Sequence, residues 1–155
     1  MNTLKDFRFR VEAAPLTRGR VRLTSDGKAP LEAAIPAEFR GGTPGMWSPE
    51  DLLVAAVTSC YVVTLRGVAE HRGLAILGLN VEGVGHVTRR AEGRIGFVVI
   101  ELRVDLTVDP ASIEQAERAA RAAKQRCLVG HALDVPIELE LQVRGADLVQ
   151  PALAV

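Results

Sequence analysis

Apolar and charged residues alternate in the first third of the chain, which is the pattern of a half-buried β-strand. Residues 7–12, with the sequence FRFRVE, place apolar side chains on one face and charged side chains on the other. Residues 20–24 repeat the alternation after a turn-like Thr-Arg-Gly sequence, and a shorter run covers residues 31–35. The pattern therefore predicts three successive strands, joined as a hairpin or a meander.

A loop rich in glycine and proline covers residues 39–47 and leads into the clearest helix signal of the chain. Ser48 suits the N-cap, Pro49 suits the first helical position, and two acidic residues follow in the first turn. We expect this helix to continue over residues 52–70. Because residues 52–65 carry no charge, most sides of the helix should be buried. A chain this small has difficulty enclosing such a helix alone, so we predict a homodimer that covers it.

The second half of the chain predicts two long strands, a helix and a final strand, which are residues 79–89, 94–108, 111–124 and 137–143. The tail, residues 150–155, has no pattern that predicts structure, and no internal repeat is present. This order of elements indicates the α+β class: strands first, then a buried helix, a long hairpin, a second helix and a closing strand. A length of 155 residues fits one domain over residues 1–155.

Composition narrows the classes of partner. Nineteen Lys and Arg residues balance nineteen Asp and Glu residues, so the formal net charge is zero. This balance provides no general attraction to nucleic acid or to an anionic membrane, and we expect neither as a partner. The charge-free stretch is shorter than the roughly 18 residues of a membrane span, and the N-terminus lacks the apolar core of a signal peptide. We therefore expect a cytoplasmic protein.

The two cysteines are the first candidates for chemistry. Cys60 lies in the middle of the apolar helix, and Cys127 lies just beyond the second predicted helix. They form no Cys-x-x-Cys motif and no dense disulfide framework, so two thiols are their default state in a reducing compartment. Taken alone, each cysteine is better explained as a small packed hydrophobe.

Two segments resemble the signatures of the OsmC/Ohr family, named for osmotically inducible protein C and organic hydroperoxide resistance protein. Residues 48–60, SPEDLLVAAVTSC, are similar to the family's first signature, in which a Pro-Glu helix start precedes an Ala-rich run ending in the peroxidatic cysteine. Residues 127–133, CLVGHAL, are similar to the segment of the resolving cysteine. The resemblance covers about residues 7–143. It implies an OsmC-like fold, with antiparallel sheets packed on a central buried helix in an intertwined homodimer.

The resemblance implies a thiol-dependent peroxidase of the oxidative stress response. Cys60 would be the nucleophile that becomes a sulfenate, and Cys127 would be the thiol that resolves it as a disulfide. Glu50 matches the family's helix-start glutamate, ten residues before the first cysteine. The substrates would be organic hydroperoxides and, less efficiently, hydrogen peroxide. No cofactor is implied beyond an external thiol or dithiol reductant.

The family also uses an arginine that polarises the peroxide and holds the cysteine as thiolate. The spacing of the OsmC branch, twenty residues before the cysteine, places it at Arg40, whereas the spacing of the Ohr branch falls on Ala37. A guanidinium suits the task because it keeps its charge, and a carboxylate such as Glu50 can orient it. As alternatives, Arg40 can be a solvated loop residue, and Glu50 can serve only the helix dipole.

Two further interpretations remain open. The spacing of Cys127 and His131 invites a metal site, but a structural zinc site normally has four ligands and no others stand at suitable positions. The function itself has a rival, because fold does not fix function. The same dimeric scaffold can serve as a non-catalytic protein that binds a small hydrophobic ligand.

Overall fold

The computed structural model describes residues 5–146, and the predicted tail over 150–155 lies outside them. The chain divides into two compact units, which meet between Leu52 and Leu53 inside the first turns of one helix. One domain over residues 1–155 stays a prediction.

The first unit is built around a small antiparallel sheet of three strands. β1 (Glu12–Pro15), β2 (Arg20–Thr24) and β3 (Leu31–Ala34) lie in sequence order. The predicted strands over 20–24 and 31–35 are thus confirmed to within one residue. The turn before β2 contains Gly19, whose φ of 79° lies in the left-handed region that glycine adopts without strain.

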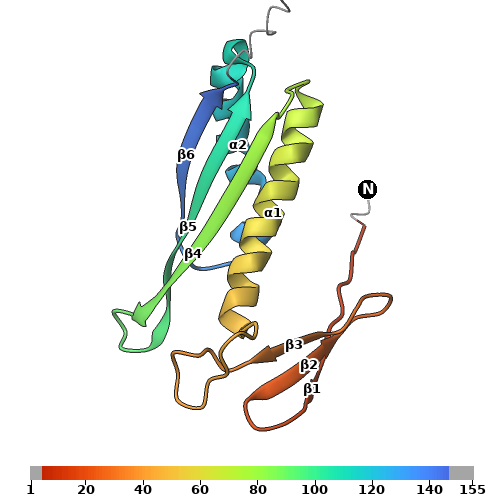
Figure 1. Cartoon of the computed structure of the whole chain (residues 1–155), viewed down its shortest axis with the longest axis vertical. Helices are drawn as coiled ribbons and strands as arrows, with labels where there is room; N and C mark the ends of the chain where they lie inside the picture. The colour runs from red at the N-terminus through yellow and green to blue at the C-terminus, as the bar shows by residue number, and fades with distance from the viewer. Residues whose placement is uncertain (1–4, 147–155) are drawn as a thin grey trace, which may run out of the picture. The chain divides into compact units, whose positions relative to one another are not determined.

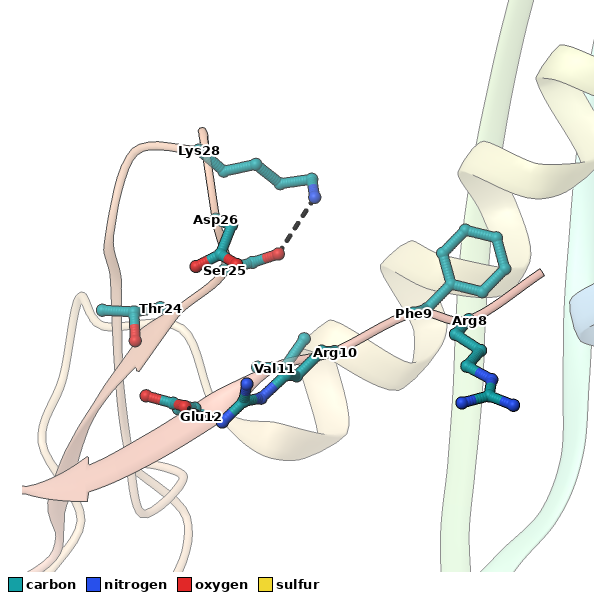
Figure 2. Close-up of a pocket in the computed structure, with 9 residues that line it drawn as sticks. All are labelled: Arg8, Phe9, Arg10, Val11, Glu12, Thr24, Ser25, Asp26 and Lys28. Carbon is teal, nitrogen blue, oxygen red and sulfur yellow. Dashed lines mark hydrogen bonds and ion pairs between the residues drawn. The ribbon is translucent and has the colours of Figure 1, made fainter.

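The predicted strand over residues 7–12 is wrong, because only Glu12 lies in β1. The register explains the difference: Glu12 pairs with Thr24, the last residue of β2, so the preceding residues run past the end of the sheet. Phe7, Phe9 and Val11 are consequently 72%, 88% and 65% exposed. Figure 2 shows this segment beside residues 24–28, with which it lines a pocket. The alternating pattern is real, but residues 5–146 supply no strand to pair with it.

Helix α1 (Pro49–His71) begins where the sequence predicts. The backbone N–H of Asp51 donates to Ser48 Oγ at 3.0 Å, and the backbone N–H of Ser48 donates to Asp51 Oδ2 at 2.9 Å. This reciprocal pair is a capping box with Asp in the place of the usual Glu, and it satisfies donors that the helix start leaves free. At the other end, Gly73 has a φ of 63° and stops the helix.

The second unit contains the larger sheet, in which β4 (Gly78–Arg89), β5 (Ile95–Val108) and β6 (Ile137–Gly145) lie side by side (Figure 1). β4 and β5 are antiparallel, as predicted. β5 and β6 are parallel, so the expectation of purely antiparallel sheets is wrong. The cause is the helical connection between β5 and β6, which returns the chain to the end where β5 began.

That connection consists of a 3₁₀ turn (Pro110–Ser112), α2 (Ile113–Arg126) and the short α3 (Leu128–His131). Small alanines on one stripe of α2 are fully buried. They join the inward side chains of β5 and one face of α1 in a single hydrophobic core. The core contains Val57, Tyr61, Leu65, Ile100, Leu102, Val104, Leu106, Ala116, Ala119, Ala120 and Ala123.

Helix α1 buries only one face within the described chain, and its burial on most sides by a homodimer stays a prediction. By length and composition α1 is able to cross a membrane, a criterion that core helices also meet. Just 28% of its most apolar 18-residue window is buried. Exposed Val63, at 70%, shows how much apolar surface this helix leaves uncovered.

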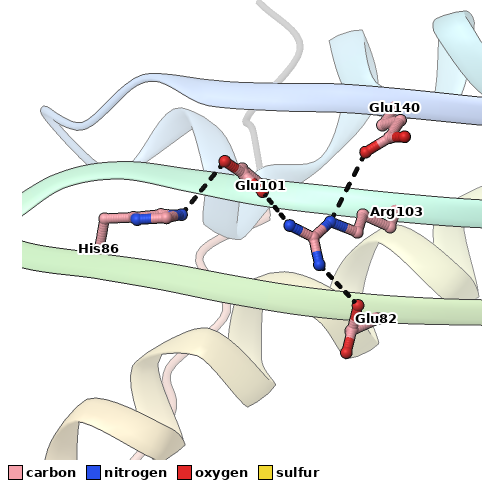
Figure 3. Close-up of polar contacts among 5 residues, drawn as sticks. All are labelled: Glu82, His86, Glu101, Arg103 and Glu140. Atoms are coloured by element: carbon pink, nitrogen blue, oxygen red, sulfur yellow. Dashed lines mark hydrogen bonds and ion pairs between the residues drawn. The ribbon is translucent and has the colours of Figure 1, made fainter.

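The face of the larger sheet opposite the core is charged. Arg103 on β5 contacts Glu101 at 2.8 Å, Glu82 on β4 at 3.2 Å and Glu140 on β6 at 3.5 Å (Figure 3). His86 Nε2 lies 3.1 Å from the other oxygen of Glu101. These half-exposed pairs span all three strands, and the inward face alone packs against the helices.

Candidate active site

The fold brings the two cysteines together, although they are far apart in the sequence. Cys60 projects from the middle of α1. Cys127 is the residue at which α2 ends and α3 begins, and its extended backbone (φ −68°, ψ 105°) separates the two helices. Both are free thiols, Cys60 half-buried and Cys127 buried at 3% exposure.

The sulfur of Cys127 is held by contacts on two sides. It accepts a hydrogen bond from the backbone N–H of Gly130 at 3.4 Å and lies 4.0 Å from the carbonyl oxygen of Val57 on α1. A Cβ at position 130 would stand 2.9 Å from Ile137 Cδ1 and 3.4 Å from the Cys127 sulfur. Any larger residue at this position would therefore displace the end of the Ile137 side chain or crowd the thiol.

Hydrogen-bond donors surround the sulfur of Cys60. Partial burial raises the pKa of the Cys60 thiol, but hydrogen bonds from the backbone of Val129 and Leu128, the Cys127 thiol and the Thr64 hydroxyl lower it by more. The net pKa of Cys60 lies below its ordinary value. Donors to a sulfur favour the charged form, so the thiolate is stabilised at this position.

The pKa of Cys127 moves the other way. Burial raises the pKa of the Cys127 thiol, and the neighbouring Cys60 raises it further, against the lowering effect of the Gly130 and Val129 backbone groups. The two pKa values thus move in opposite directions, which favours thiolate at Cys60 over thiolate at Cys127. The lowered pKa of Cys60 agrees with the activated cysteine that the sequence predicts. The groups that lower it belong to α3, Thr64 and Cys127, and the sequence did not indicate them in this role.

The remaining predicted site residues lie in the first unit. Arg40 stands exposed in the turn after β3 and makes no ion pair among residues 5–146. Glu50 lies half-buried in the first turn of α1, and its Oε2 atom is buried with no hydrogen-bond partner in the described chain. Ala37, the alternative arginine position, carries no charge and lies exposed in the same turn as Arg40.

Glu50 lines a cavity of about 700 Å³, enclosed by β2, β3 and the loop that follows β3. Two arginines that the sequence did not indicate, Arg18 and Arg20, line the same cavity. Arg20 pairs with Glu32 at 2.8 Å while its Nε atom stays buried without a partner. Arg18 makes no ion pair within residues 5–146. The sequence feature that could have indicated this cluster is Arg-Gly-Arg at residues 18–20, in a tight turn.

The described residues show no arrangement of side chains that supports a metal site at Cys127 and His131. His131 Nε2 contacts the carbonyl oxygen of Gln125, which ties the ring to the end of α2. Across residues 5–146 no three His, Cys, Asp or Glu side chains gather at one point. Cys127 has Cys60, rather than His131, as its reactive neighbour.

Comparison with known proteins agrees with this architecture. The family model described as OsmC-like protein matches residues 42–142. The uncharacterized protein YmaD of Bacillus subtilis is 26% identical over 145 residues, covering 90% of this chain and 95% of YmaD.

Solved structures are also similar. The OsmC-like protein of unknown function VCA0330 from Vibrio cholerae superposes with a TM-score of 0.78 at 13% identity, covering 90% of this chain and 100% of that one. An organic hydroperoxide resistance protein from Elizabethkingia anophelis gives a TM-score of 0.72 at 23% identity, covering 94% and 100%. The chain, with its α+β fold, belongs to the OsmC-like protein family.

Proposed function

We propose that the protein is a cysteine-based peroxidase that reduces organic hydroperoxides to alcohols, and hydrogen peroxide less efficiently. The observation that carries the proposal is that Cys60 and Cys127 are neighbours, with the pKa of Cys60 lowered and that of Cys127 raised. Peroxides are attacked by thiolate rather than thiol, so the hydrogen bonds around Cys60 supply the required state. One similar structure is that of a protein named for organic hydroperoxide resistance.

In the proposed cycle, the Cys60 thiolate attacks the terminal oxygen of the hydroperoxide. The O–O bond breaks, Cys60 becomes a sulfenic acid, and the alkoxide leaves and takes a proton to form the alcohol. Cys127 then attacks the sulfenic sulfur, water leaves, and a Cys60–Cys127 disulfide forms. An external thiol reduces this disulfide and restores both thiols. The proposed location is the cytoplasm, where the resting state is two thiols.

We further propose that the arginine that acts with Glu50 comes from the Arg18–Arg20 cluster, in place of Arg40. The cavity that both arginines line also contains Glu50, whose unpaired Oε2 is able to orient a guanidinium. Arg20 already neutralises Glu32, which leaves Arg18 as the arginine free for a ligand. Arg40, exposed in a turn, has no comparable surroundings.

The proposed assembly is an intertwined homodimer. The apolar residues left exposed on α1 and in the segment over residues 7–11 support this proposal, since large exposed apolar surfaces mark interaction sites. A second copy of the chain would cover both.

The test is a consumption assay with cumene hydroperoxide, tert-butyl hydroperoxide and hydrogen peroxide. Wild-type protein should turn over with a thiol reductant and favour the organic peroxides. Cys60→Ser should be inactive, and Cys127→Ser should complete one turnover before Cys60 overoxidises. No consumption by wild-type protein under any reductant would contradict the peroxidase and favour a ligand-binding role for the 700 Å³ cavity.

A further inference from the structure

The short helix α3 supplies hydrogen bonds to both thiols. The backbone of Leu128 and Val129 bonds to Cys60, and the backbone N–H of Gly130 donates to the sulfur of Cys127 at 3.4 Å. Each of these bonds depends on where the backbone of α3 lies. Whatever holds α3 in place therefore also sets the polar surroundings of the two sulfurs.

Helix α3 is too short to hold itself in place. It covers four residues, Leu128–His131, and its turn is closed by the backbone N–H of His131, which donates to the carbonyl oxygen of Cys127 at 3.0 Å. A single turn is unstable on its own, because fixing the first turn costs more free energy than one hydrogen bond returns. Gly130 adds to this cost, since glycine is a poor helix former. Contacts from outside the turn must therefore stabilise it.

The side chain of His131 provides such a contact at the far end of α3. Its Nε2 atom lies 2.5 Å from the carbonyl oxygen of Gln125. A carbonyl oxygen only accepts hydrogen bonds, so Nε2 carries the proton and donates it. Gln125 is the penultimate residue of α2, where carbonyl groups have no partner within their own helix. The bond thus links the end of α3 to the end of α2, across the extended residue Cys127 that separates the two helices.

We infer that His131 is a positioning residue of the thiol site: its imidazole ties α3 to the end of α2 and so keeps the backbone of α3 against the sulfurs of Cys60 and Cys127. The ring bonds to Gln125 and acts on the sulfurs through α3. The inference rests on the proposed function for its part in catalysis, because the Cys60 thiolate is the proposed nucleophile. The effect of His131 on Cys60 itself is measurable without peroxide.

Three substitutions separate the hydrogen bond of His131 from its charge and from the fold. His131→Gln places an amide nitrogen near the position of Nε2 and keeps the donor to Gln125. His131→Asn is one methylene shorter and loses this contact, and His131→Ala removes the donor altogether. All three variants are uncharged at this position. Because His131 is exposed, each variant should fold as the wild type does, which urea denaturation verifies.

The measurement is the rate at which limiting iodoacetamide alkylates Cys60 in the fully reduced protein, followed over a series of pH values by peptide mapping. Thiolate is the reacting form, so the pH dependence reports how well Cys60 is stabilised as thiolate. In His131→Asn and His131→Ala the rise should move to higher pH, and below the plateau the rate should fall roughly threefold, the effect of weakening one hydrogen bond. His131→Gln should match the wild type.

A wild-type profile in both His131→Asn and His131→Ala would overturn the inference, as would a His131→Gln profile equal to theirs. Faster alkylation of Cys60 at every pH in His131→Asn and His131→Ala would also overturn it, because that result indicates a loosened site rather than a destabilised thiolate. If the expected shifts occur and the wild type consumes no peroxide, only the proposed peroxidase fails. If the wild type consumes peroxide and the shifts are absent, only the role of His131 fails.

Discussion

Cys60 owes its chemistry to neighbours contributed by a different part of the chain. Two backbone groups at the start of α3, the Cys127 thiol and the Thr64 hydroxyl all favour its thiolate. Burial alone would have the opposite effect on its pKa. The pH at which Cys60 becomes reactive therefore depends on these contacts, and measuring it tests them.

Replacing Thr64 with Val should raise the pKa of Cys60, because the variant loses one donor to the thiolate and keeps the shape of the side chain. With Thr64 intact, the rate of iodoacetamide alkylation at Cys60 should increase with pH and level off below the ordinary cysteine range, since thiolate is the reacting form. In Thr64→Val this rise should move to higher pH. Both proteins are measured in a Cys127→Ser background.

Ser59→Ala is the matched control, because the Ser59 hydroxyl contacts the carbonyl oxygen of Ala56 on its own helix rather than the thiol. It should leave the titration unchanged. Identical profiles for Thr64→Val and Ser59→Ala would contradict the role given to Thr64.

The arginine assignment is tested by three single changes to Ala. Arg18→Ala, and to a smaller extent Arg20→Ala, should lower kcat/KM for cumene hydroperoxide, by about 10²-fold or more if the guanidinium stabilises charge in the transition state. Arg40→Ala should be close to wild type because Arg40 lies in an exposed turn. A large loss in Arg40→Ala with none in the other two would restore the assignment made from the sequence.

The sequence indicated both cysteines because each stands in a recognisable segment, one within an apolar helix and one just after a helix end. It did not indicate Thr64, Gly130 or Arg18, because their roles depend on which elements pack together. A threonine on a helix and a glycine after a cysteine are too common to signal a site, and only the contact of α3 with α1 gives them meaning.

At the scale of elements, the close approach of α1 to β4 fixes where the helix, and with it Cys60, stands on the sheet. A Cβ at Gly83 would lie 2.1 Å from Thr58 Oγ1 and 3.0 Å from Val54 Cγ1. We expect Gly83→Ala to lower the free energy of unfolding by about 1–3 kcal/mol, through overpacking, as measured by urea denaturation.

Gly67→Ala provides the opposite control. Gly67 is exposed within α1, and nothing lies within 4 Å of a Cβ built there. Alanine should raise the free energy of unfolding by roughly 1 kcal/mol because it is the better helix former. Two changes of the same sign would contradict the packing described for β4.

Local signals predicted most of the elements, and the errors share one cause. The correctly predicted elements depend on residues near one another in the sequence, as in the start of α1, the hairpin of β4 and β5, and helix α2. The direction of β6 depends on its pairing with β5. Whether residues 7–11 form a strand depends on a pairing strand from another part of the sheet. An alternating pattern indicates which face of a strand is apolar, but it does not identify the strand that pairs with it.

At the scale of the whole molecule, the proposed dimer makes a prediction about the segment before β1. Phe7→Ser/Phe9→Ser should weaken dimerisation at least tenfold, since each buried Phe contributes about 1.5–3 kcal/mol. The control, Arg8→Ser/Arg10→Ser, changes the opposite face of the same exposed segment and should leave the dimer intact. Sedimentation equilibrium measures both; a folded wild-type monomer at micromolar concentration would contradict the dimer.

The central claim, that Cys60 and Cys127 form one redox pair, is tested most directly by intact-mass spectrometry after a stoichiometric dose of cumene hydroperoxide. The account predicts a mass lower by two hydrogens, and a non-reduced peptide map in which the two cysteines are linked within one chain. Two unmodified thiols with the peroxide unconsumed would contradict it.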